Sequence, residues 1–83
     1  MSRHIVQARD KKYQVVLGWD TPLNTYFAQV YDRSIEDEDD QLILWESGTP
    51  IPIHDLEALA RIVWEYAIVP QDILTRLYRD ANT

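Results

Sequence analysis

The chain has 83 residues, of which 46% are hydrophobic, and a formal net charge of −6. This length allows one domain with a small core, and the apolar content is too high for a disordered chain. No cysteine is present, which excludes disulfides, thiolate metal sites and a cysteine nucleophile. We therefore expect a single domain over residues 1–83. Association with another subunit would add the stability that so small a core lacks.

The charge is unevenly distributed along the chain. Residues 1–12 hold four basic residues and one acidic residue, and the rest of the chain is strongly acidic. Because phosphates repel an acidic domain, we expect no nucleic-acid partner. No apolar run approaches the ~20 residues that span a bilayer, and no secretory signal is visible. We expect a cytoplasmic protein with no membrane contact.

The first half of the chain predicts a small sheet. Residues 1–12 are expected to be frayed or to form a short extra strand. Three runs rich in β-branched and aromatic residues then predict strands at residues 13–19, 25–31 and 41–45. A tight turn containing Pro22 separates the first two strands, and a charged, solvated loop at residues 33–40 separates the last two. The simplest topology is an antiparallel meander.

Two helices are expected in the second half. Prolines 50 and 52 keep the chain extended, and apolar residues at helical spacing then predict a helix over residues 55–67. Pro70 ends this helix and begins a second one that runs to about Asp80. The predicted fold class is α+β, with a three-stranded antiparallel β-meander followed by two C-terminal helices packed on one face of the sheet.

The alternation of side chains along the strands predicts which face is the core. If a four-residue loop places Trp19 opposite Asn24, one face is apolar throughout. Its residues are Tyr13, Val15, Leu17, Trp19, Tyr26, Ala28, Val30, Leu42 and Leu44. A slip of one residue would exchange the two faces.

The opposite face carries Phe27, Tyr31 and Trp45. In this register they form an exposed aromatic patch, which is typical of a surface that binds a partner or a second copy. Alternatively, residues 1–12 cover this face, or the aromatic rings pack on one another.

The acidic run consists of Glu36, Asp37, Glu38, Asp39 and Asp40. It fails as an EF-hand loop, because Leu42 stands where the invariant glycine belongs and Gly48 stands at the position of the bidentate glutamate. Three interpretations remain: a solvated loop, a weak cation-binding loop, or a mimic of nucleic-acid phosphates.

Catalytic and cofactor motifs are missing. The two histidines, His4 and His54, lack metal-ligand spacing, and no serine lies in a G-x-S-x-G motif. The two glycines cannot form a P-loop or a dinucleotide fingerprint. Asp20 is the best candidate for acid–base chemistry, with turn capping as the alternative. We expect no catalytic residue, no metal site and no cofactor.

One segment carries a resemblance. The run Gly18–Asp32 (GWDTPLNTYFAQVYD), followed by Leu44 and Trp45, resembles a group of small bacterial proteins of about this length, whose function is unknown. The resemblance covers most of the chain from Tyr13. It implies a bacterial, stand-alone, cytoplasmic domain and no activity that can be transferred.

These observations favour a non-enzymatic protein-interaction domain that uses the face of Phe27, Tyr31 and Trp45, with a homodimer as one form. The alternative is an acidic regulator or inhibitor that binds a basic partner through residues 36–40. A binder of small molecules or ions is a third class.

Overall fold

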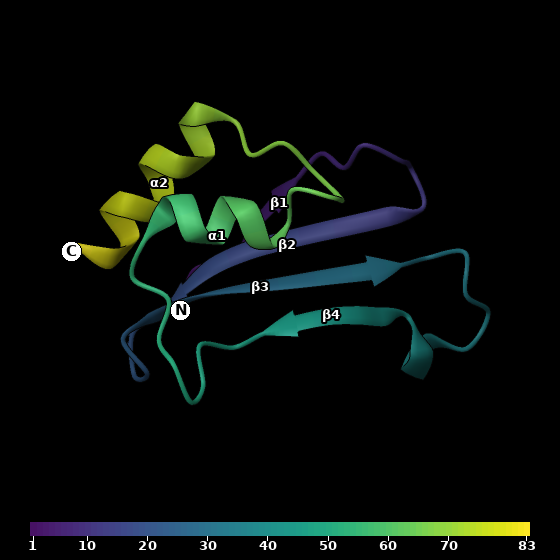
Figure 1. The fold of residues 1–83 in the computed structure, drawn as a ribbon, viewed down its shortest axis with the longest axis horizontal. Helices are drawn as coiled ribbons and strands as arrows, with labels where there is room; N and C mark the ends of the chain where they lie inside the picture. Colours follow the sequence, from purple (N-terminus) through teal and green to yellow (C-terminus); the bar gives the residue numbers. More distant parts are fainter.

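The computed structural model describes residues 1–83 and confirms an α+β fold with an antiparallel sheet (Figure 1). The sheet has four strands rather than three, in the order β1-β2-β3-β4. The strands are β1 (His4–Val6), β2 (Tyr13–Asp20), β3 (Thr25–Asp32) and β4 (Leu42–Glu46). A 3-10 turn, η1 (Glu38–Asp40), precedes β4, and the helices are α1 (Leu56–Ile62) and α2 (Gln71–Ala81). None of the helices combines the length and the apolar character that a membrane crossing requires.

The fourth strand comes from residues 1–12, for which the sequence left two outcomes open. β1 pairs antiparallel with the edge of β2, with Ile5 opposite Val16. Two contacts hold this segment in place. Ser2 exchanges hydrogen bonds with the backbone of Trp19, at 3.0 and 3.1 Å. His4 Nε2 lies 2.7 Å from Asp80 Oδ2, at the C-terminal end of α2.

The hairpin of β2 and β3 differs in register from the prediction. Asp20 pairs with Thr25 and Trp19 with Tyr26, so the register is two residues away from the predicted one. Asn24 closes the turn with a φ of 55°, a left-handed conformation that asparagine adopts more readily than most residues. Because side chains alternate with a period of two, a shift of two residues leaves the face assignment of both strands unchanged.

The core lies between the sheet and the helices, where α1 packs on β3 and α2 on β2. Its fully buried residues are Val15, Leu17, Ala28, Val30, Leu59, Val63, Ala67 and Leu77. Burial of each valine or leucine side chain contributes about 1.5–3 kcal/mol.

The first helix is shorter than predicted. The Asp55 carboxylate caps α1 by accepting a hydrogen bond from the Glu57 N–H at 3.0 Å, but the helix ends at Ile62 instead of Ala67. The following turn is tied to the N-terminal segment, since the Tyr66 carbonyl accepts from the Arg9 N–H at 2.8 Å. The Trp64 carbonyl accepts from Arg9 Nε at 2.9 Å. Helix α2 follows Pro70, as predicted.

Strand β4 contains an irregularity that corrects the prediction for Leu42. The register against β3 shifts between Val30 and Tyr31, so that Val30 pairs with Leu44 and Tyr31 pairs with Leu42. Leu44 packs against the core, as predicted. Leu42 does not, because the shift places it opposite Tyr31, and 41% of its surface is exposed.

Residues 47–54 return the chain from β4 to the helical layer. They pass over Thr25, which is fully buried. Its Oγ1 accepts from the Ile53 N–H at 2.7 Å and donates to the Tyr26 carbonyl at 2.9 Å. Gly48 has a φ of +81°, and a Cβ at this position would overlap the Thr25 side chain. The buried hydroxyl therefore fixes the path of this connection.

Candidate functional site: the edge strand β4 and the aromatic sheet face

The sheet face opposite the helices contains the three predicted aromatic residues, but they are not equally exposed. Phe27 is only 3% exposed, so the expectation that its ring is accessible is wrong. The ring lies over Gly18, where a Cβ would overlap both the ring and the Ser2 carbonyl. Its other neighbour is Trp45, with ring centroids 6.1 Å apart. The predicted alternative, in which the aromatic rings pack on one another, is confirmed for this pair.

Trp45 is the accessible member of the patch. Half of its surface is exposed. Tyr31 is half-buried and donates a weak hydrogen bond of 3.3 Å to Gln29 Oε1. Trp45 is therefore the most exposed of the three aromatic side chains, whereas Phe27 is buried and Tyr31 is half-buried.

Trp45 lies on β4, which is an edge strand. The outer side of β4 has no neighbouring strand, and Figure 1 shows it along the lower border of the fold, away from α2. Leu42 and Ile43 are also about 40% exposed. An edge strand presents a row of unpaired N–H and C=O groups, and most proteins protect such edges with charges or proline. This one combines a free edge with three large apolar side chains.

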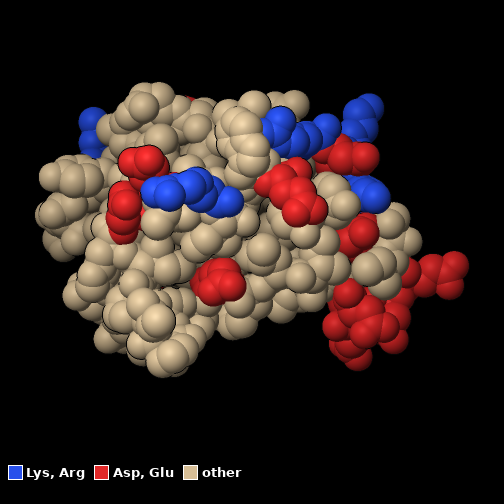
Figure 2. All heavy atoms as spheres, in the orientation of Figure 1, with Lys and Arg blue, Asp and Glu red and all other residues tan.

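The acidic run leads directly into this strand. Residues 36–40 are all exposed, and Asp37 Oδ1 accepts from the Asp39 N–H at 3.0 Å, which starts η1. Figure 2 shows the acidic side chains gathered at the lower right, at the end of the molecule where β4 begins. Glu46 adds an exposed carboxylate at the other end of the strand. No group of three or more His, Asp or Glu side chains in the protein is arranged to hold a metal ion.

Asp20, the acid–base candidate from the sequence, has a structural contact. Its Oδ1 accepts from the Leu23 N–H at 3.3 Å, which is the turn-capping interaction that the sequence offered as the alternative.

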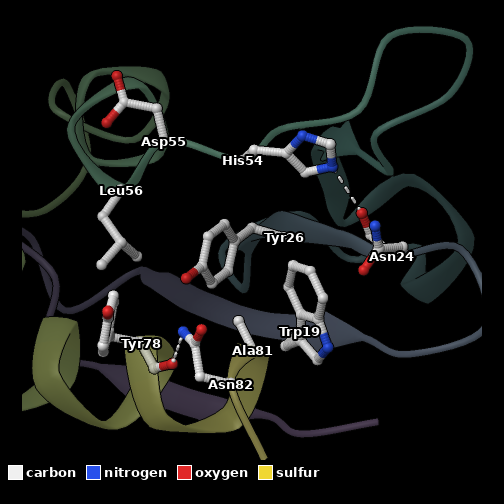
Figure 3. A pocket seen from close by; sticks show the side chains of 9 residues that line it. All are labelled: Trp19, Asn24, Tyr26, His54, Asp55, Leu56, Tyr78, Ala81 and Asn82. Atoms are coloured by element: carbon white, nitrogen blue, oxygen red, sulfur yellow. Dashed lines mark hydrogen bonds between the residues drawn. The ribbon is translucent and has the colours of Figure 1, made fainter.

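A second candidate site was not predicted. A pocket of about 520 Å³ lies between the end of the β2–β3 hairpin, the residues that enter α1, and the C-terminal turn of α2 (Figure 3). Trp19, Tyr26 and Tyr78 are among its walls, and its polar lining residues are Asn24, His54, Asp55 and Asn82. Three segments distant in the sequence build it, so no local motif could have indicated it.

No protein-family model, no curated protein and no solved structure matches this chain. The resemblance to a group of small bacterial proteins therefore stays a prediction.

Proposed function

We propose that this chain is a non-enzymatic protein-interaction domain, and that it binds an extended segment of a partner along the outer edge of β4. The supporting observation is the combination of a free strand edge with exposed Leu42, Ile43 and Trp45. Added strands gain affinity from main-chain hydrogen bonds and specificity from alternate side chains. In this arrangement the indole of Trp45 supplies the aromatic anchor that is common at interfaces.

Charge decides the chemistry of the partner. Residues 36–40 lie at the start of β4 and Glu46 at its end, and all are exposed. If two copies paired antiparallel through β4, the acidic run of each would approach Glu46 of the other, and like charges would repel. A segment with alternating apolar residues and Lys or Arg at its flanks meets opposite charge at both ends. This proposal joins the aromatic surface and the acidic run into one site.

Selection from a library of displayed random peptides tests this function. We expect the wild-type domain to enrich extended sequences with apolar alternation and basic flanks. Trp45→Asp is expected to abolish the enrichment. The matched control is Trp64→Asp, since Trp64 is 60% exposed and lies beyond α1, outside the proposed surface.

Three results would contradict the proposal. Enrichment of acidic sequences is one, and equal binding by the Trp45→Asp variant is another. The third is sedimentation of the wild-type domain as a dimer that Trp45→Asp converts to a monomer, because this face would then be covered by a second copy.

A further inference from the structure

We propose that the pocket beside the β2–β3 hairpin is a binding site for a small organic cation, of the substituted ammonium class. This site is separate from the surface of β4. Three features support it: the size of the pocket, a tyrosine hydroxyl that has no partner within the protein, and a lining without basic residues.

The pocket has the size and the aromatic walls that such a ligand needs. Its volume of about 520 Å³ is within the range of small-molecule sites. The rings of Trp19 and Tyr26 meet edge to face with centroids 4.9 Å apart and are 7% and 3% exposed. Tyr78 stands at the mouth with 60% of its surface exposed. Figure 3 shows the Tyr26 ring between Trp19 on one side and Leu56 on the other.

The hydroxyl of Tyr26 is free to bind a ligand. The residue is almost fully buried, yet its hydroxyl has no hydrogen-bond partner in the protein. Every hidden side-chain nitrogen or oxygen does have a partner, so this hydroxyl is reached from the pocket, into which it points in Figure 3. Burial, and then the neighbouring Tyr78 and Asp80, raise the pKa of Tyr26. The hydroxyl therefore stays protonated at neutral pH and can bond to a ligand.

The lining selects for positive charge. It includes the acidic residue Asp55, whose carboxylate turns away toward the start of α1 in Figure 3, and no lysine or arginine. His54 Nε2 donates to the Asn24 carbonyl at 2.8 Å. Asn82 Nδ2 donates to the Tyr78 carbonyl at 2.7 Å, which leaves its Oδ1 as an acceptor. The Asn82 oxygen and the aromatic rings, with an acidic residue close by and no basic one, together attract an ammonium group and repel an anion.

Choline and 3,3-dimethylbutan-1-ol provide a matched pair of probes, because the alcohol has the same shape without the charge. Titration followed by NMR is expected to show saturable shifts of the Trp19 indole N–H with choline. We expect binding of the neutral alcohol to be at least ~10-fold weaker, since cation–π attraction contributes most where water is excluded.

Two variants locate the site. Asp55→Asn removes the charge but keeps the helix cap, because Asn and Asp cap helices equally well. We expect it to weaken choline binding ~3-fold or more. Tyr78→Ala removes the exposed ring at the mouth and is expected to weaken binding further. Trp64→Ala is the control that leaves affinity unchanged.

The proposal is overturned if the neutral alcohol binds as tightly as choline, or if Asp55→Asn binds choline with wild-type affinity. It is equally overturned if no saturable shift occurs up to ~50 mM choline.

Discussion

The ring of Phe27 lies against the ring of Trp45, with centroids 6.1 Å apart and planes inclined at 48°. Phe27 belongs to β3 and is buried, whereas Trp45 belongs to the edge strand β4 and is half exposed. Gly18 on β2 makes room for the inner ring. Trp45, which a partner would contact, therefore packs on Phe27, which a partner would not reach.

This difference in burial predicts that truncating the two aromatic residues lowers the free energy of unfolding by different amounts. Phe27→Ala should lower the free energy of unfolding by about 3–5 kcal/mol, because it leaves a cavity beneath Trp45. Trp45→Ala should cost roughly 1 kcal/mol, since half of its surface is already in water. Urea unfolding followed by circular dichroism measures both. Equal losses for the two variants would refute the claim that Phe27 contributes more to stability than Trp45 does.

Gly18 should tolerate no side chain. A methyl group there overlaps the Phe27 ring and the Ser2 carbonyl, so Gly18→Ala is expected to destabilise the protein by about 1–3 kcal/mol. In a Phe27→Ala background the same change should cost less, because one of the two obstacles is gone. A double-mutant cycle of unfolding free energies measures this coupling. Purely additive losses would show that the Phe27 ring is not what excludes a side chain at position 18.

Thr25 should contribute through its hydroxyl. Thr25→Val keeps the shape but leaves the Ile53 N–H without its partner, which we expect to cost about 1–3 kcal/mol. Thr75→Val is the matched control, because Thr75 is exposed and donates to a carbonyl within its own helix. It should change stability by less than about 0.5 kcal/mol. Similar losses in both variants would argue against a special role for the buried hydroxyl.

The contact between His4 and Asp80 should make stability depend on pH. Partial burial would raise the pKa of Asp80, but hydrogen bonds from His4 and Ser2 outweigh it, and the pKa is lowered. A carboxyl whose pKa is lower in the folded state stabilises the protein above its unfolded pKa, and the contribution is lost as pH falls through the folded pKa.

Asp80→Asn should therefore destabilise the protein at neutral pH, by about 0.2–1 kcal/mol for this partly exposed pair. The difference from wild type should shrink as the pH falls below ~4. Unfolding free energies at several pH values check this, with the exposed Glu65→Gln as the control. A difference that stays constant from neutral pH to pH ~3 would contradict the assignment.

Much of the fold could be predicted from local pattern. The strands at residues 13–19, 25–31 and 41–45 were placed within about one residue, because β-branched and aromatic runs bounded by turn formers are strong signals. The faces of β2 and β3 were correct in spite of the register error. β1 was only an alternative, because three residues among charges carry little periodicity.

The errors come from contacts that the sequence does not show. The prediction for Leu42 is wrong because the register shift between Val30 and Tyr31 reverses the faces of the β4 residues that precede Leu44. Phe27 is buried because its ring fills the space above Gly18. That space lies beside Phe27 only when Gly18 and Phe27 pair across β2 and β3, which the sequence does not show. The pocket around Tyr26 needed Tyr78 and His54 from other segments, so only the folded chain reveals it.

The proposed addition of a partner strand to β4 is tested most directly by amide hydrogen exchange, measured by NMR with and without a selected peptide. We predict that the β4 amide protons pointing away from β3 exchange at least ~10-fold more slowly in the complex, and that high salt weakens this protection. Protection that appears on the helices while the exchange of β4 remains unchanged would contradict the account.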